Sequence, residues 1–310
     1  MQRIVYLRML IGTATVAALL GVIALSGQGR PDDAVRELSG AIDIHVHSDP
    51  DSRARSIDAI DVAKLAKAKG MRGIVLKNHD DPTGGLAYIV RKEVPGLEVF
   101  GGIALNLAVG GINPAAVQHM TEVSGGWGRI VWMPTYDAEN HIRTGNETRP
   151  FVSVSRNGDL LPEVKQVIGL IARNGLVLAT GHSSPAEGLM LVREGRRQGV
   201  QHMVVTHATF TPVFMNVDQM KEAAREGAFI EFAGGSVNGA GGAARMDSMA
   251  DAIRKVGPDS CILSSDLGQR GNPFPPDGFG AFLQAMRARG FTEQEVDRMA
   301  KINPARLLGL

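Results

Sequence analysis

The sequence predicts an α/β fold, a (β/α)8 TIM barrel, over residues 41–310. Three observations favour it: a repeated helix–glycine–strand pattern, eight short apolar runs, and polar residues gathered at the ends of those runs. A chain of 310 residues could also hold two ordinary domains. However, no linker or change in composition divides residues 41–310, so we expect one domain.

The repeated pattern is an amphipathic stretch that ends in glycine and leads into a short apolar run. Clear copies are "AKLAKAKGMRGIVLKNH", "GLIARNGLVLATGHSS" and "KEAAREGAFIEFAGG". Each is typical of a helix, a glycine C-cap and a strand. The runs predict strands at residues 41–47, 72–79, 98–106, 128–135, 175–182, 202–209, 227–234 and 261–268.

Most of these runs are apolar on both faces, as strands must be when a core lies inside a barrel and helices lie outside it. The first helix is expected to start at Ser56, with Ile57, Ile60 and Leu65 at helical spacing. An open doubly wound sheet is the rival fold, but no GxGxxG motif follows the first strand. The glycine-rich stretch 234–244 comes after strand seven, and we expect it to form a flexible loop over the barrel mouth.

Residues 1–30 differ from the rest of the chain. Arg3 and Arg8 precede the uncharged run "MLIGTATVAALLGVIAL", which is followed by the small polar stretch "SGQG". This arrangement predicts a signal peptide or, as the alternative, an uncleaved N-terminal membrane anchor, although the run is slightly short for a span of about 20 residues. Either alternative places the folded part outside the cytoplasm, periplasmic or extracellular, with membrane contact only through this segment.

Charge and cysteine content narrow the class of partner. The 33 basic and 32 acidic residues nearly cancel and form no long basic run, which argues against nucleic acid. We expect a small-molecule substrate, and the sequence leaves a homo-oligomer open. Cys261 has no partner for an intramolecular disulfide and is expected to pack in the core.

Polar side chains end five of the predicted strands, where the active sites of (β/α)8 barrels are built. In "DIHVHSDP", His45 and His47 are two positions apart, so both project from the same face of strand one. A lone histidine at a strand end is more often a packing residue than a ligand, but several at one end of a barrel predict a divalent metal site. The set is His45, His47, Lys77, His79, His182, His207 and Asp266.

This ordered set, together with the C-terminal "NPARLLGL" (303–310), resembles the amidohydrolase superfamily of metal-dependent hydrolases. The resemblance covers residues 41–310 and implies a distorted barrel with one or two divalent ions, Zn²⁺ first, with Mn²⁺, Fe²⁺, Ni²⁺ or Co²⁺ as alternatives. It implies that His45, His47 and Asp266 hold the more buried metal. His182 would bind a second metal or the same one, and His207 would bind the second metal or face the substrate.

The chain departs from the family pattern at strand four, where many two-metal members place a carbamylated lysine or a glutamate. Here that strand reads "GRIVWMPTYD". Lys77, at the end of strand two, leaves three alternatives open: a displaced bridging carbamate, an ammonium that holds a substrate anion, or a structural ion pair. His79 is either a ligand or a hydrogen-bond donor to one. Glu231, inside strand seven, is expected to pair with a basic residue such as Lys77, or to face the pocket.

The implied chemistry is hydrolysis at a carbonyl or phosphoryl centre. A bound metal lowers the pKa of a water molecule to about 7; Asp266 would accept its proton, and His207, if not a ligand, would polarise the electrophile. We expect an enzyme, a metal-dependent hydrolase of a small molecule with an amide, lactam, lactone, ester or phosphoester bond. A one-metal decarboxylase or deaminase is the alternative, and a non-catalytic metal-binding or ligand-binding barrel is a further one.

Four further residues are candidates for substrate contact. Trp132, Tyr136 and His141 follow strand four, in a loop that would either touch substrate or be an ordinary surface loop. Arg270 follows strand eight in a proline-rich segment and would hold a carboxylate or be exposed to solvent. We do not expect His119, in a helix, or His202, at the opposite end of strand six, to be catalytic.

Overall fold

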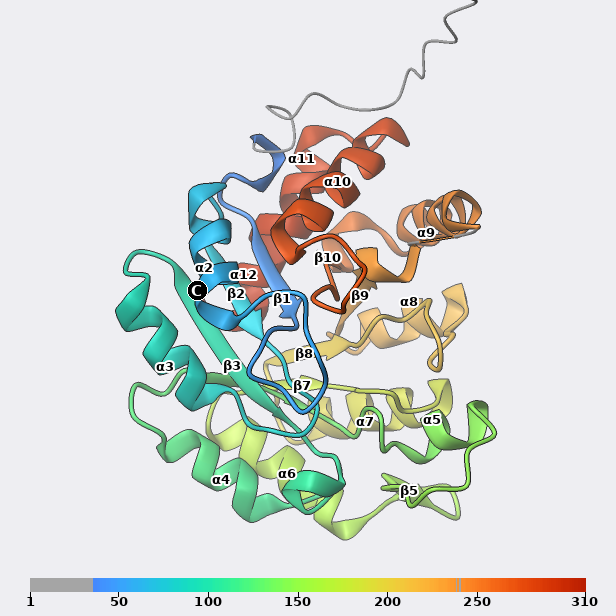
Figure 1. Ribbon diagram of the computed structural model, residues 1–310. Coiled ribbons are helices and arrows are strands. Elements are labelled where there is room, and N and C mark those ends of the chain that lie inside the picture. The colour runs from blue at the N-terminus through green and yellow to red at the C-terminus, as the bar shows by residue number, and fades with distance from the viewer. Residues whose placement is uncertain (1–35, 238, 240) are drawn as a thin grey trace, which may run out of the picture.

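The computed structural model describes residues 36–237, 239 and 241–310. Its centre is a sheet of eight parallel strands in the order β1-β2-β3-β4-β7-β8-β9-β10, with helices on the outside (Figure 1). The predicted (β/α)8 barrel is confirmed, and each of the eight predicted strands forms. They are β1 (Ile42–Val46), β2 (Gly73–Leu76), β3 (Glu98–Ala104), β4 (Gly128–Trp132), β7 (Val177–Ala179), β8 (His202–Val205), β9 (Phe229–Ala233) and β10 (Cys261–Ser264).

Helices connect successive strands along the chain. Between β4 and β7 the chain adds a short helix and a two-stranded hairpin, β5 (Ser155–Arg156) and β6 (Asp159–Leu160), to one side of the barrel (Figure 1). The α-helices are α2 (Ala59–Ala68), α3 (Gly84–Glu93), α4 (Pro114–Glu122), α5 (Glu139–Thr144), α6 (Pro162–Arg173), α7 (Pro185–Arg197), α8 (Val217–Arg225), α9 (Gly242–Val256), α10 (Pro275–Ala288), α11 (Glu293–Asp297) and α12 (Asn303–Leu308). Short helical turns are η1 (Leu107–Val109), η2 (Gly234–Val237), η3 (Pro258–Ser260) and η4 (Arg298–Ile302).

The sequence predicts a flexible loop at residues 234–244 and a leader at residues 1–30. The glycine-rich stretch 234–244 is in part helical, because η2 covers its first residues and α9 begins at Gly242. The predicted leader, residues 1–30, lies outside the described residues. Within the part of the chain that the structure describes, no helix is both long and apolar enough to cross a membrane.

Local capping signals set where the helices begin. α2 begins at Ala59 rather than at Ser56, because the Asp58 carboxylate accepts hydrogen bonds from two backbone N–H groups of the first turn. α7 begins with a capping box, in which the Ser184 hydroxyl accepts from the N–H of Glu187 and the Glu187 carboxylate accepts from the N–H of Ser184. These caps fix where the helices after β1 and β7 begin.

Apolar side chains pack in two layers. The outer layer lies between strands and helices and includes Val62, Ile74 and Leu178, and the predicted packing residue Cys261 is fully buried there. The inner layer fills the barrel and includes Phe100, Ile130 and Val204. Because inner and outer residues alternate along most of the strands, both faces of the sheet are covered.

The C-terminal helix α12 closes the barrel at the N-terminal ends of its strands. Leu307 and Leu308 pack in the inner layer. The fully buried Asn303 donates from Nδ2 to the carbonyl oxygens of Pro258 and Cys261, at 2.9 and 2.7 Å. The "NPARLLGL" motif therefore forms the floor of the barrel, opposite the strand ends that carry the predicted site residues.

A β-bulge in β1 determines which of its side chains face the inside. The register of β1 against β2 shifts between Asp43 and Val46, so that two residues of β1 oppose one residue of β2. Such a bulge reverses the alternation of faces beyond it. Ile42 packs in the inner layer before the bulge, and His45 and His47 face the inside after it.

The barrel closes between β1 and β10 at their C-terminal ends. The backbone N–H of Asp266 donates to the carbonyl oxygen of His45 at 3.0 Å, and that of His47 donates to Leu267 at 2.9 Å. A parallel bridge joins Val46 to Leu267. This closure places Asp266 beside the two histidines of strand one.

Candidate metal centre

A cavity of about 360 Å³ opens at the C-terminal ends of the strands. All seven strand-end residues that the sequence singles out gather there. His45 lies beneath the cavity and is 1% exposed, and the other six line it. Those six are His47, Lys77, His79, His182, His207 and Asp266.

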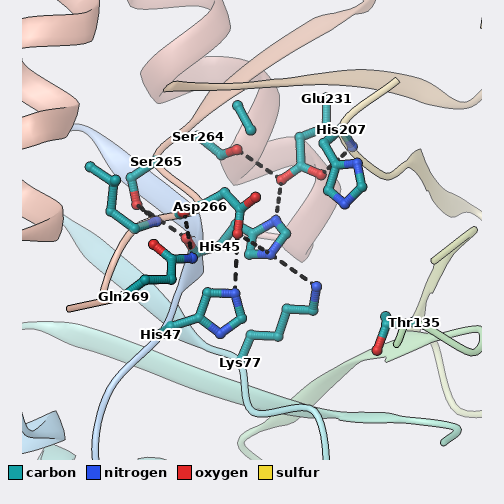
Figure 2. A network of polar contacts seen from close by, with 12 residues as sticks. His45, His47, Lys77, Thr135, His207, Glu231, Ser264, Ser265, Asp266 and Gln269 are labelled. Carbon is teal, nitrogen blue, oxygen red and sulfur yellow. Dashed lines mark hydrogen bonds and ion pairs between the residues drawn. The ribbon is translucent and has the colours of Figure 1, made fainter. Parts of the chain in front are cut away.

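Three of these residues converge on one point. The ligand atoms of His45, His47 and Asp266 all lie within 4.8 Å of one another. The Asp266 Oδ1 atom is 3.1 Å from His45 Nε2 and 3.1 Å from His47 Nε2. Figure 2 shows the Asp266 carboxylate between the two imidazoles. This is the trio to which the family resemblance assigns the more buried metal.

Glu231 holds His45 from the side away from Asp266 (Figure 2). Its Oε1 atom is 2.9 Å from His45 Nδ1 and accepts from the Ser264 hydroxyl at 2.8 Å, and its Oε2 accepts from the backbone N–H of His207 at 2.8 Å. The Glu231 carboxylate thus binds a basic side chain inside the barrel, as expected, but that side chain is His45 rather than Lys77. A carboxylate at Nδ1 favours the tautomer with a proton on Nδ1, which leaves an electron pair on Nε2 for a metal.

Lys77 is 1% exposed, and its Nζ atom lies 2.9 Å from His45 Nε2. Burial lowers the pKa of Lys77 to about 8, although the charges of Asp266 and Glu231 oppose this shift. Within the described part of the chain no carboxylate forms an ion pair with the ammonium. The structure therefore disfavours the ion-pair alternative, and the carbamate and substrate-anion alternatives stay predictions.

The remaining histidines lie along the wall of the same cavity. His79 Nδ1 is 2.8 Å from Thr135 Oγ1, and His182 Nδ1 is 2.9 Å from His141 Nδ1. The ring centroids of His182 and His207 are 4.9 Å apart. These histidines stand outside the group of three converging ligands, so their roles toward a second metal or a substrate stay predictions.

Burial keeps the histidines neutral, the form that binds metal ions. It lowers the pKa of His47 to about 3 and that of His207 to about 4, and it holds the pKa values of His79 and His182 well below their usual range. For Asp266, burial alone would raise the pKa, but the neighbouring imidazoles hold it well below its usual range. The cavity therefore presents neutral imidazoles and an anionic carboxylate at neutral pH.

Two of these residues have an uncommon backbone conformation. Asp266 has a φ of +48° and His207 has a φ of +24°. These values lie in the left-handed region, which residues other than glycine seldom adopt. Hydrogen bonds hold both residues there: Asp266 N–H donates to His45, and His207 N–H donates to Glu231. Backbone strain of this kind clusters at functional sites, where surrounding contacts over-determine the conformation.

The donor set fits a divalent cation. With a proton on His45 Nδ1, His45 Nε2 and Asp266 Oδ1 are both acceptors, and they face each other at 3.1 Å. Two acceptors at this distance require a positive charge beside them. The Lys77 ammonium, 2.9 Å from His45 Nε2, supplies that charge here, and a divalent cation can supply it in the same place. Among the described residues, the buried His207 Nδ1 and His47 Nδ1 have no hydrogen-bond partner. Two imidazoles and one carboxylate are a common ligand set for catalytic Zn²⁺ and related ions.

The four predicted substrate contacts divide into two pairs. Tyr136 and His141 line the cavity. Trp132 does not, because it is the last residue of β4 rather than part of a loop, is 2% exposed and packs in the inner layer. Arg270 is exposed and also lies outside the cavity wall, with its Nε donating to the carbonyl oxygen of Arg55 at 3.4 Å.

The sequence analysis missed several residues of the cavity wall. Phe210 follows β8, and Gln269 and Asn272 follow Asp266. Their places directly after strand ends could have identified them, whereas their residue types give no signal. Thr135, the partner of His79, is held by Asn106, whose Nδ2 donates to its hydroxyl at 2.7 Å; these two residues come from loops that meet only in the folded chain.

Residues 40–231 match a family of unknown function, DUF6282. The chain belongs to this family. The range of the DUF6282 match includes His45, His47, Lys77 and His207, whereas Asp266 lies beyond it. No curated protein sequence matches the chain significantly.

Solved structures share the fold of this DUF6282 member. An amidohydrolase from Pseudomonas aeruginosa superposes with a TM-score of 0.61 at 12% identity, covering 89% of this chain and 97% of its own. A probable dipeptidase, PvdM, from the same organism gives 0.61 at 11% identity, with 90% and 98% covered. A probable 2-pyrone-4,6-dicarboxylic acid hydrolase from Acinetobacter baumannii gives 0.58 at 13% identity, with 87% and 100% covered. The predicted likeness to the amidohydrolase superfamily is thus confirmed at the level of the fold.

Proposed function

We propose that the protein is a metal-dependent hydrolase acting on a small molecule with an amide, lactam, lactone, ester or phosphoester bond. The convergence of His45, His47 and Asp266 within 4.8 Å, at the floor of a cavity, carries this proposal. Solved structures with this fold include a probable dipeptidase and a probable pyrone dicarboxylic acid hydrolase, which supports hydrolysis as the type of reaction. Zn²⁺ is the first choice of ion, since imidazole and carboxylate suit it.

The residues of the chain would divide the work as follows. His45, His47 and Asp266 would hold a divalent ion, which supplies a Lewis acid and lowers the pKa of a water molecule. Asp266 is anionic and reaches the cavity, with 14% of its side chain exposed, so its carboxylate can accept a proton from the attacking water and return it to the leaving group. Neutral His207 lies along the cavity wall, where it can donate a hydrogen bond to the substrate oxygen.

A mononuclear decarboxylase or deaminase is the second candidate. Two observations favour it: the described residues form one group of three converging ligands, and β4 is followed by Thr135, which is not a bridging ligand. Without a carbamate, Lys77 beside His45 would be an ammonium that binds a substrate anion, which fits this candidate. Metal stoichiometry distinguishes the two, because two equivalents with a carbamate on Lys77 support the hydrolase and one equivalent without it supports the second candidate.

The test begins with metal binding. Chelator-treated protein titrated with Zn²⁺ is expected to bind one or two equivalents, measured by calorimetry and by elemental analysis. His45→Ala should lose the buried ion, and His119→Ala, an exposed histidine on α4, should bind as the native protein does. Hydrolysis of a panel of esters, lactones and amides should then depend on the metal. Full metal content in His45→Ala would contradict the proposal.

We also propose that the protein acts outside the cytoplasm, periplasmic or extracellular, as the charged and apolar residues 1–30 suggest. Its substrate would then be a small molecule met in that compartment. Fractionation of cells that express the full chain tests this, since protein found only in the cytoplasm would contradict it.

A further inference from the structure

A second, apolar pocket of about 280 Å³ lies next to the metal-centre cavity. It is formed by the loop after β8 and by the start of α9. Most of its described wall is apolar side chain, from Phe210, Phe214, Val237, Ala244 and Met249. We call this space the side pocket.

The side pocket and the metal-centre cavity share a wall. Phe210 lines both, and its ring centroid is 5.8 Å from that of His207. The loop after β9 likewise contributes to both, because Gly235 lines the cavity and the next residue, Ser236, lines the side pocket. Gly235 also packs on the segment of Asp266: its N–H donates to the Ser265 carbonyl oxygen at 2.7 Å. Two segments that line the metal-centre cavity therefore also line the side pocket.

Two of the four polar residues in the wall of the side pocket, Ser236 and Arg245, form hydrogen bonds within the protein. The Ser236 hydroxyl donates to the carbonyl oxygen of Ala233 at 2.6 Å, and Arg245 Nε donates to the carbonyl oxygen of Ser236 at 2.9 Å. Phe214, by contrast, is 59% exposed at the edge of the pocket. An apolar group that enters would cover Phe214 and would displace no polar contact between these residues.

We propose that the side pocket receives an apolar acyl or aryl group of the substrate while the reacting bond lies at the metal centre. This inference rests on the proposed function and narrows its substrate class to bonds that carry such a group. Because a closed cavity of about 150 Å³ holds benzene in another protein, the side pocket has room for a single ring or a chain of about six carbons.

The test uses simple hydroxamic acids, which bind metal ions through their head group and need no turnover. Acetohydroxamate, butyrohydroxamate, hexanohydroxamate and benzohydroxamate are titrated into the Zn²⁺-loaded protein by calorimetry. Each added methylene is expected to lower the dissociation constant about two- to fourfold up to six carbons, as burial of apolar surface requires. Metal binding, measured first and without hydroxamate, tests the proposed function separately.

Two variants of α9 make the test specific. Ala244→Phe fills the side pocket from an exposed position and should abolish the gain with chain length. Ala243→Phe places the same side chain on a neighbouring exposed residue outside the pocket wall and should retain that gain. Zn²⁺ content, measured on both variants, shows that each has folded around the metal centre.

Three results would overturn the inference. The first is that all the hydroxamic acids bind the native protein with the same dissociation constant, whatever their chain length. The second is an undiminished gain with chain length in Ala244→Phe. The third is a dimer that dissociates in Ala244→Phe but not in Ala243→Phe, seen by sedimentation, because the side pocket would then be covered by a second copy of the chain.

Discussion

The imidazole of His45 lies between two carboxylates, that of Glu231 behind it and that of Asp266 in front of it. Burial alone would raise the pKa of Glu231, but its interaction and hydrogen bond with His45, together with the backbone N–H of His207, lower it to about 2, so Glu231 is anionic whenever the protein is folded at ordinary pH. An anionic partner at Nδ1 orients the ring and makes Nε2 a stronger donor to a metal. Glu231 therefore acts through His45 rather than on the substrate.

Replacement of Glu231 tests this at the scale of a single residue. Glu231→Gln should weaken Zn²⁺ binding about 10- to 100-fold, since partners of ligating histidines have effects of this size. Competition with a fluorescent chelator measures the affinity. Ser264→Ala is the matched control, because it removes one hydrogen bond to Glu231 but leaves the contact with His45. Equal affinities for Glu231→Gln and native protein would show that Glu231 only stabilises the fold.

The thiol of Cys261 should be inert. It is fully buried at the start of β10, and burial raises its pKa, so almost no thiolate forms at neutral pH. A thiol reagent such as Ellman's is expected to give no colour with the native protein and one equivalent after unfolding in urea. Rapid labelling of the folded protein would contradict the burial of this side chain.

Among the elements, α12 should matter to stability more than its short length suggests. Leu307→Ala removes a fully buried side chain from the inner layer and should lower the free energy of unfolding by about 2–5 kcal/mol. Leu310→Ala, at a residue 41% exposed, should change it by less than about 0.5 kcal/mol. Urea unfolding followed by circular dichroism measures both. Similar values for the two variants would mean that α12 does not close the barrel.

The bulge in β1 shows why sequence patterns locate the candidate site well but do not settle every side chain. Strict alternation places His45 and His47 together on one face, and this is confirmed. It also places Ile42 on the opposite face, whereas Ile42 packs inside the barrel because the register shifts by one residue. The shift depends on how β1 pairs with β2, and the local sequence of either strand does not specify it.

Loop positions were the least predictable part of the candidate site. Trp132 belongs to the strand and packs below Lys77, with Nζ 5.3 Å from its ring centroid. It fits there because Gly102, on the neighbouring strand, lacks a side chain: a Cβ atom at Gly102 would lie 2.5 Å from the Trp132 ring. Arg270 lies outside the cavity wall, where its Nε donates to the carbonyl oxygen of Arg55. Such contacts join segments far apart in the chain, so no local pattern reveals them.

For the whole molecule, the buried histidines predict strong acid sensitivity of the metal-free protein. In the folded state His47 and His207 have pKa values of about 3 and 4, against about 6.5 when unfolded. Below about pH 6.5 the unfolded chain therefore binds more protons, and stability falls with falling pH by up to about 1.4 kcal/mol per pH unit for each such histidine. Burial raises the pKa of Asp43 to about 6, so between about pH 4 and 6 this residue favours the folded state as the pH falls. It is a single group, and the several buried histidines outweigh it.

Urea unfolding of chelator-treated protein at pH 7, 6 and 5 measures this effect. The midpoint should drop steeply between pH 6 and 5. Added Zn²⁺ should raise the midpoint at pH 7, because a ligand that binds only the folded state stabilises it by about 2.7 kcal/mol at 100 times its dissociation constant. A flat profile between pH 7 and 5 would mean that the histidines are not buried in the neutral form.

The overall architecture was the most predictable feature, because it is encoded repeatedly. Each of the eight βα units carries its own apolar strand and amphipathic helix, so an error in one leaves the barrel recognisable. The ends of the strands were predictable for the same reason, and with them the convergence of His45, His47 and Asp266. The residues that orient each ligand, such as Glu231 beside His45, come from other strands of the closed barrel. The sequence of a single βα unit therefore does not predict them.

The position of α12 at the end of the chain also constrains the order in which the barrel folds during synthesis. The strand synthesised first, β1, pairs at one edge with β10, and α12, which packs at the opposite end of the barrel, follows β10 in the chain. A growing polypeptide can therefore form βα units one after another but cannot assemble its metal ligands, since Asp266 arrives more than two hundred residues after His47. We therefore expect the candidate metal site to be complete only after β10 and Asp266 have been synthesised.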